Sequence, residues 1–328
     1  MATINGVEQG VSTYSYTQQF IERPDFGIDT VLKHVADLGV RRFELVGAQT
    51  FGAYPVPEAR EIDEVLESSE KHGLEPFSYG GYVDLGRITG YRMSEDDILS
   101  DIHLDIMTTK ALGAKYMRGS GISAQLLPRV AELAERHDVT IGLEIHAPHT
   151  PSDPSTLEYM KVLEKLGTTR VGLVPDFGMF IERPTEIAIN RYVELGADRD
   201  RLEWIIENRH NGMTEEEMQE HIASRGGGEG EKIAISEWFG YLSFAPADIE
   251  GFAAMVPYVS YVHGKFYHVN EDLDEPTIPY AAAMQTLVKG GFTGVFLSEY
   301  EGHAFYLDDA DEQLRRHLAM GEKILTDM

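Results

Sequence analysis

Short apolar or β-branched segments alternate with amphipathic segments along the chain, and glycine lies at most of the junctions between them. Residues 37–46, 71–78 and 111–117 are three examples. Glycine suits the left-handed position that ends a helix, and a basic residue in the last turn faces the negative end of the helix. Each junction therefore predicts a helix followed directly by a strand.

The apolar segments predict eight strands, at 10–16, 42–46, 75–79, 115–119, 140–146, 171–175, 259–265 and 293–298. Segments of helical periodicity lie between most of them, for example 62–71 and 126–135. A doubly wound open sheet is the alternative, but it would place a glycine-rich phosphate loop after the first strand, where the chain has none. We therefore predict an α/β fold, a (β/α)8 TIM barrel, in one domain spanning residues 1–328.

One connection is much longer than the others, because more than 80 residues separate the sixth and seventh predicted strands. The excess, at about 181–250, is polar and helix-rich. Thr214 and Glu217 have the spacing of a capping box that starts a helix. Residues 225–231 predict a flexible glycine-rich turn, and residues 233–239 predict an extra strand. An insertion after a barrel strand lies on the catalytic face, so we expect a lid, a specificity loop or a subunit contact.

Composition narrows the classes of function. The chain of 328 residues has a net charge of −27 and no cysteine. The absence of cysteine excludes disulfides, thiolate nucleophiles, Cys-ligated zinc and iron–sulfur clusters. The strong negative charge argues against nucleic acid and anionic membranes as partners. The N-terminus does not resemble a signal peptide, and no apolar stretch approaches the roughly 18 residues of a spanning helix. We expect a soluble, cytoplasmic protein that acts on a small molecule.

Four side chains that commonly bind metals lie at the ends of the last four predicted strands: Glu144, Asp176, His263 and Glu299. A single acidic residue at a strand end is usually solvated or caps a helix, but four consecutive strands ending this way are far less expected by chance. In a parallel barrel all four would meet at one end. Three carboxylates and one imidazole favour a single divalent ion, Mn²⁺ or Mg²⁺ before Co²⁺ or Zn²⁺.

His146 is the candidate acid/base. It lies two residues after Glu144, and positions i and i+2 of a strand point to the same side. An imidazole beside the metal suits proton transfer near neutral pH. The alternative is a structural histidine that bonds to a neighbouring loop.

Three further residues are candidates for substrate binding. Lys265 lies two residues after His263 and either contacts substrate oxygens or forms an ordinary charge on the rim. Glu44 ends the second predicted strand and is either a substrate residue or an inner-barrel residue. His210, in the insertion, is a candidate to approach the site.

These motifs resemble the xylose isomerase-like TIM-barrel superfamily of sugar isomerases and epimerases, inosose dehydratases and family 2 AP endonucleases. The resemblance covers nearly the whole chain and rests on Glu144, Asp176, His263 and Glu299, although His263 lies in Val-His-Gly-Lys where relatives often have His-Val-Lys. It implies one divalent metal, often Mn²⁺, that binds vicinal oxygens of a sugar or cyclitol while a base removes a proton next to a carbonyl. The AP endonuclease branch fits poorly, because it has more metal ligands and a basic DNA-binding face.

Within this superfamily, Glu144-Ile-His146, the Pro-Asp-Phe-Gly segment at 175–178 and the long insertion are most similar to the alpha subunits of bacterial C-glycoside deglycosidases. That similarity implies a lyase for the carbon–carbon bond of 3-oxo-C-glycosides. It also implies a Mn²⁺-type site, a catalytic base matching His146, and a small, separately encoded beta subunit in a hetero-oligomer. The alternatives are a metal-dependent sugar or cyclitol isomerase, epimerase or dehydratase, and a non-catalytic barrel subunit, against which the intact ligand set argues.

Overall fold

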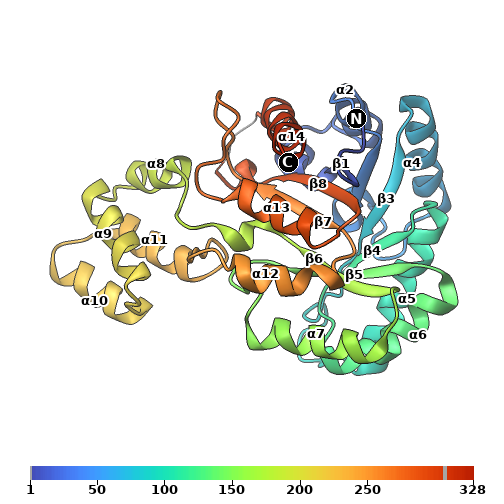
Figure 1. Cartoon of the computed structure of the whole chain (residues 1–328), viewed down its shortest axis with the longest axis horizontal. Helices are drawn as coiled ribbons and strands as arrows, with labels where there is room; N and C mark the ends of the chain where they lie inside the picture. The colour runs from blue at the N-terminus through green and yellow to red at the C-terminus, as the bar shows by residue number, and fades with distance from the viewer. Residues whose placement is uncertain (1, 306–308) are drawn as a thin grey trace.

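The predicted alternation of strands and helices folds into a barrel of parallel strands with helices around it (Figure 1). The computed structural model describes residues 2–305 and 309–328. The strands are β1 (Val7–Ser12), β2 (Arg42–Val46), β3 (Glu75–Gly80), β4 (Tyr116–Gly119), β5 (Thr140–Ile145), β6 (Val171–Pro175), β7 (Val262–Phe266) and β8 (Gly294–Tyr300). Their order in the sheet is β6-β5-β4-β3-β2-β1-β8-β7, and isolated parallel bridges such as Asp176 to His263 join β6 to β7. The predicted (β/α)8 barrel is confirmed.

Helices connect successive strands. They are α1 (Thr17–Glu22) and α2 (Ile28–Asp37), α3 (Gly47–Thr50) and α4 (Ala59–His72), α5 (Glu95–Ala111), α6 (Leu127–His137), α7 (Pro154–Leu166), α12 (Ile249–Met255), α13 (Tyr280–Lys289) and α14 (Ala310–Thr326). The end of α4 has the predicted chemistry: Gly73 is left-handed, with φ 69°, and Lys71 and His72 lie in the last turn.

The barrel interior is apolar in one part and polar in another. Five buried side chains form an inner apolar cluster: Phe77, Val174, Tyr261, Val295 and Leu297. A larger apolar core lies between the strands and the surrounding helices. The inner cluster fills part of the barrel interior. Its close packing supports the polar residues near the strand ends and limits their movement.

The insertion between β6 and β7 consists of helices α8 (Glu186–Glu194), α9 (Arg199–His210), α10 (Glu215–Ser224) and α11 (Glu229–Phe239). They project from one side of the barrel (Figure 1). The Thr214 capping box is present and starts α10, as predicted. The Trp238 side chain is fully buried and contacts Tyr192 and Phe244.

The prediction of an extra strand at 233–239 was wrong, because these residues belong to α11. Its buried residues are Gly230, Glu231, Ala234, Ile235 and Trp238, which follow the helical period. The short Ile-Ala-Ile alternation imitates a strand only locally. The glycine-rich turn is also shorter than predicted, since α11 begins directly after Gly228.

The first strand begins and ends earlier than predicted. Residues Thr13–Tyr16 form a 3₁₀ helix, and the Ser12 side chain caps it by accepting a hydrogen bond from the Tyr14 backbone N–H. The β-branched and aromatic residues of this segment favour a strand by propensity, but the Ser12 cap stabilises the 3₁₀ helix instead.

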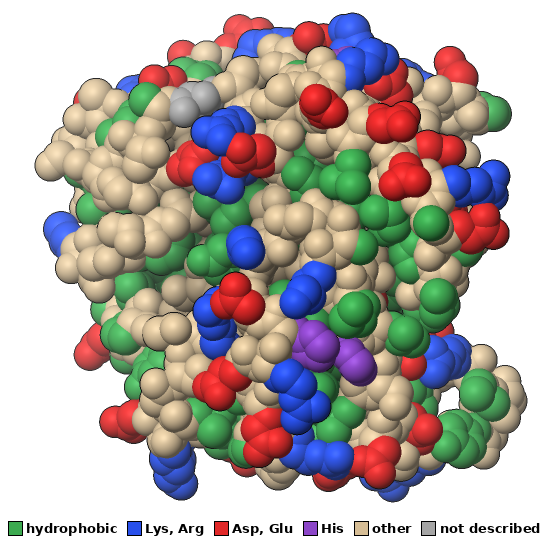
Figure 2. All heavy atoms as spheres, turned by 90° about the vertical axis from the view of Figure 1, so that its right-hand side faces the viewer, with side chains coloured by type: hydrophobic (Ala, Val, Ile, Leu, Met, Phe, Trp, Pro, Cys, Tyr) green, Lys and Arg blue, Asp and Glu red, His purple; other side chains and the backbone are tan. Residues whose placement is uncertain are grey.

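The outer face formed by α4, α5 and α6 carries acidic and basic side chains side by side (Figure 2). Arg129 of α6 pairs with Asp96 of α5 at 2.6 Å, and Lys71 of α4 pairs with Asp29 of the neighbouring helix α2 at 2.7 Å. No helix among the described residues is both long enough and apolar enough to cross a membrane.

Two buried aspartates on α5 predict a pH-dependent stability. Asp101 is paired with Arg87 at 2.9 Å, whereas Asp105 Oδ1 has no hydrogen-bond partner in the described chain. Burial and the charge of Asp101 raise the pKa of Asp105 to about 7. Folded Asp105 thus holds its proton to a higher pH than the unfolded carboxyl, and stability falls as pH rises from about 4 to 7.

We expect Asp105→Asn to stabilise the fold by about 1–3 kcal/mol at pH 8 and by much less at pH 4.5, because the amide removes the cost of ionisation. Urea denaturation at the two pH values measures the difference. An equal effect at both would contradict the assignment.

Candidate metal centre

The structure brings together the four predicted metal-binding side chains at one end of the barrel. Glu144 is the penultimate residue of β5, Asp176 follows β6, and His263 and Glu299 lie within β7 and β8. One potential ligand atom from each residue lies within 4.8 Å of the others. Asp176, His263 and Glu299 are buried, and Glu144 is partly exposed. The cluster is therefore a partly enclosed pocket of donor atoms that opens on the Glu144 side.

Hydrogen bonds orient each member of this cluster. His263 Nδ1 lies 2.8 Å from Glu144 Oε1 and 3.3 Å from Glu299 Oε2. Asp176 Oδ1 accepts a hydrogen bond of 2.7 Å from the Gly178 backbone N–H, which caps a short 3₁₀ helix. The remaining Asp176 oxygen lies 2.9 Å from Lys265 Nζ. One nitrogen of His263 and one oxygen of each carboxylate thus face a common point.

The cluster carries more negative charge than its cations balance. Five carboxylates, on Glu44, Glu144, Asp176, Glu299 and Glu301, contact or surround Lys265 and Arg118. Burial and the neighbouring charges of Glu299 and Glu144 raise the pKa of Asp176 to about 6, although Lys265 opposes the rise. Crowded carboxylates of this kind are stabilised by a cation placed among them.

The donor set fits a divalent ion of the Mn²⁺ or Mg²⁺ type. Oxygen atoms and one imidazole nitrogen are ligands for such ions, and two ligands on opposite sides of one ion lie about 4.2 Å apart. The observed spread of up to 4.8 Å needs only a small contraction to reach that geometry. Glu144, Asp176, His263 and Glu299 would hold the ion.

His146 directly follows β5, two residues after Glu144. It lines, together with Glu144 and His149, a pocket of about 480 Å³. The ring is exposed, and its Nδ1 lies 2.6 Å from the carbonyl oxygen of Ala147. A carbonyl oxygen can only accept, so Nδ1 carries a hydrogen, and in the neutral form of the ring Nε2 has the lone pair. The predicted i, i+2 relation thus leads both side chains to one cavity, with one imidazole nitrogen available as a base.

The three predicted substrate residues occupy different places. Lys265 Nζ lies between Asp176 and Glu301, at 2.9 and 3.0 Å. Glu44 is fully buried inside the barrel beneath His263, which corresponds to its inner-barrel alternative. His210 lies at the exposed end of α9, where its ring packs against Phe244 of the insertion. The structure therefore places Lys265 in the cluster, Glu44 under it, and His210 in the projecting helices.

Sequence reasoning missed Arg118. Its Nη1 donates to Glu144 Oε2 at 2.7 Å, and its Nε lies 3.9 Å from Glu44. Arg118 lies near the C-terminal end of β4, so it satisfies the same positional rule as the four predicted ligands. Basic residues at strand ends could have been searched for with the acidic ones.

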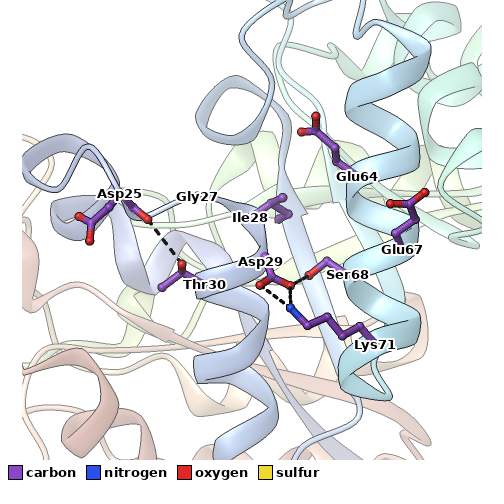
Figure 3. A pocket seen from close by; sticks show the side chains of 9 residues that line it. All are labelled: Asp25, Gly27, Ile28, Asp29, Thr30, Glu64, Glu67, Ser68 and Lys71. Atoms are coloured by element: carbon purple, nitrogen blue, oxygen red, sulfur yellow. Dashed lines mark hydrogen bonds and ion pairs between the residues drawn. The ribbon is translucent and has the colours of Figure 1, made fainter.

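A separate groove of about 540 Å³ lies between α2 and α4 (Figure 3). Asp25, Asp29, Glu64 and Glu67 line it, but Lys71 Nζ lies 2.7 Å from Asp29 and Ser68 donates to the same carboxylate at 3.0 Å. Hydrogen bonds from Lys71, Ser68 and His72 lower the pKa of Asp29 to about 2. This groove lies between two outer helices, and Lys71 already balances the negative charge of Asp29. We therefore assign the groove no role in catalysis.

Comparisons with known proteins agree with this geometry. The chain matches the family model described as the xylose isomerase-like TIM barrel over residues 32–324. It is 28% identical to the 3'-dehydrocarminate deglycosidase alpha subunit of Microbacterium sp. over 321 residues, which cover 93% of this chain and 91% of the relative. It is 27% identical to a C-glycoside deglycosidase alpha subunit of Arthrobacter globiformis, over 92% of this chain and 86% of the relative.

Solved structures support the fold. The IolI protein with a bound zinc atom superposes with a TM-score of 0.59 at 14% identity, covering 98% of both chains. D-Psicose 3-epimerase of Clostridium cellulolyticum with D-tagatose has a TM-score of 0.59 at 12% identity, covering 97% of this chain and 99% of the other. At these identities the likeness concerns the barrel alone.

Proposed function

The chain belongs to the xylose isomerase-like TIM-barrel family, and we propose that it is the metal-dependent alpha subunit of a deglycosidase for 3-oxo-C-glycosides. The observation that carries the proposal is that Glu144, a member of the cluster with Asp176, His263 and Glu299, lines the same pocket as His146. The two relatives named as deglycosidase alpha subunits support it.

The bond to be broken explains the residue types. A carbon–carbon link to an aromatic ring offers no leaving-group oxygen to protonate, so the two-carboxylate chemistry of ordinary glycosidases does not apply. Oxidation of the sugar at C3 by another enzyme acidifies the proton at C2. The present enzyme then has to remove that proton, stabilise the enolate and release the aglycone.

We assign the first step to His146. With its Nδ1 hydrogen donated to Ala147, Nε2 accepts the C2 proton, and the C–H electron pair forms the enolate. The enolate collapses to a C1–C2 double bond, and the aglycone leaves from C1 with the bonding pair. The protonated imidazole then returns its proton to the aglycone carbon, so protons and electrons balance.

The neighbouring cations suit the developing negative charge. The ammonium group of Lys265 has three hydrogens, and its contacts with Asp176 and Glu301 leave one to bind a substrate oxygen. A bound divalent ion, for which we propose Mn²⁺, would supply Lewis-acid stabilisation where the enolate charge develops. Arg118 donates a hydrogen bond to Glu144 Oε2 and so holds this carboxylate in place.

A partner subunit follows from the names of the relatives. Each of the two curated relatives is described as an alpha subunit, which implies that those proteins work with a second subunit. We propose that this chain likewise assembles with a small beta-type subunit in a hetero-oligomer.

The test is release of aglycone. The protein with Mn²⁺ is incubated in D₂O with a 3-oxo-C-glycoside and a 3-oxo-O-glycoside, each with and without a candidate beta subunit. We expect free aglycone from the C-glycoside, detected by chromatography, in an amount that the partner increases. Deuterium at C2 without aglycone would identify an epimerase instead. Neither product, with all subunits and metal present, would contradict the proposal.

A further inference from the structure

Glu44 is a fully buried carboxylate next to the cluster. It lies on β2, with no exposed surface, and its carboxylate lies 3.1 Å from His263 Nε2. The other nitrogen of the same ring, Nδ1, faces Glu144 and Glu299. One side of the imidazole thus contacts the candidate metal ligands, and the opposite side contacts Glu44.

The strand register builds a fitted cradle for this carboxylate. Ser12 on β1 and Ser78 on β3 are the cross-strand neighbours of Glu44. The Ser78 hydroxyl donates to Glu44 Oε2 at 2.7 Å, Tyr261 donates to it at 3.0 Å, and Ser12 donates to Oε1 at 3.3 Å. The small serines leave room for the carboxylate between them, and the pairing of β2 with β3 shifts register at this point. Three hydroxyl donors therefore hold the Glu44 carboxylate in its position next to His263.

We infer that Glu44 is a positioning residue for metal binding, because it holds His263 Nε2 and so directs Nδ1 toward the shared point of Glu144, Asp176 and Glu299. This inference rests on the metal site of the proposed function. A metal-binding histidine usually gives its second ring N–H to a carboxylate or carbonyl, which fixes the tautomer and the ring orientation. Here all three hydroxyl donors and the carboxylate come from inside the barrel, out of reach of substrate.

The test measures metal affinity and geometry as well as activity. We expect Glu44→Gln, which keeps the shape of the side chain, to weaken Mn²⁺ binding by about 10-fold and Glu44→Ala by about 100-fold, measured by isothermal titration calorimetry. The visible spectrum of the Co²⁺-loaded protein reports ligand geometry, and it should change in Glu44→Gln. Thermal melting of the metal-free proteins shows whether each variant folds.

Glu301→Gln is the matched control, because it removes the same charge beside the cluster but contacts Lys265 and Tyr14 instead of His263. It should change the Mn²⁺ affinity much less and leave the Co²⁺ spectrum intact. Tyr261→Phe removes one donor to Glu44 while every charge stays, so it should weaken Mn²⁺ binding in the same direction as Glu44→Gln, by a smaller factor. If the Glu44 variants fail to fold, the Mn²⁺ affinity of Tyr261→Phe tests the positioning role of Glu44 instead.

The outcomes separate the two proposals. Normal Mn²⁺ binding by Glu44→Gln, or equal losses in Glu44→Gln and Glu301→Gln, would overturn the positioning role and leave the proposed function standing. A wild-type protein that binds no divalent ion would overturn the proposed function, and this inference with it.

Discussion

Replacing any one of Glu144, Asp176, His263 or Glu299 with alanine should abolish tight metal binding and lower turnover by on the order of 10³-fold. A Lewis acid contributes several kcal/mol of transition-state stabilisation, and each 1.36 kcal/mol is a tenfold change in rate. Metal content of the purified variants and aglycone release measure the two effects. Chelation of the wild-type protein should abolish activity, and Mn²⁺ should restore it best.

The four proposed ligands are not equivalent in the metal-free protein. Burial, together with the charges of Glu299 and Glu144, raises the pKa of Asp176, whereas the charge of Glu144 is partly balanced by Arg118. Removing Asp176 should therefore cost metal affinity but little stability in the metal-free protein. Glu231→Gln is the control: Glu231 is equally buried, but it lies in the insertion and is held by Arg201. Full activity in a metal-free wild-type protein would refute the metal site altogether.

The barrel was predictable because its signals are local and repeated. Each αβ junction carries its own helix end and strand, as at Gly73, and the positional rule for parallel barrels then places the strand ends together. The same rule predicted the candidate metal ligands Glu144, Asp176, His263 and Glu299, each of which lies in a short sequence motif. Their convergence required only that the strands close into one barrel.

The sequence did not predict features that depend on contacts between residues far apart in the chain. Residues 233–239 have an alternating apolar pattern, yet they form part of helix α11, in which Trp238 packs against Tyr192, which is far away in the sequence, and Phe244, which lies outside the helix. The role of Glu44 could not be derived either. Its environment comes from Ser12 on β1, Ser78 on β3, and Tyr261 and His263 at and in β7, and the register of these three strands is not encoded in any one segment.

His146→Gln should lower turnover by about 10²–10⁴-fold while the protein keeps its metal and its fold, since that is the usual contribution of a positioned acid/base. Glutamine preserves a polar side chain at the pocket wall but has no basic nitrogen to take the C2 proton. Exchange of the C2 proton with solvent deuterium, followed by mass spectrometry of the substrate, should fall together with aglycone release. That joint loss would assign His146 to the proton-abstraction step.

His149→Gln provides the comparison within the same pocket. His149 also lines the cavity, but its Nδ1 lies 3.4 Å from Asp153, so its imidazole is held by the loop. Its replacement should leave proton exchange near the wild-type rate. If His146→Gln lost metal along with activity, His146 would be a ligand, and the cluster would extend into the pocket. If it kept both metal and turnover, the ring would be structural, and the base would have to be another group of the site.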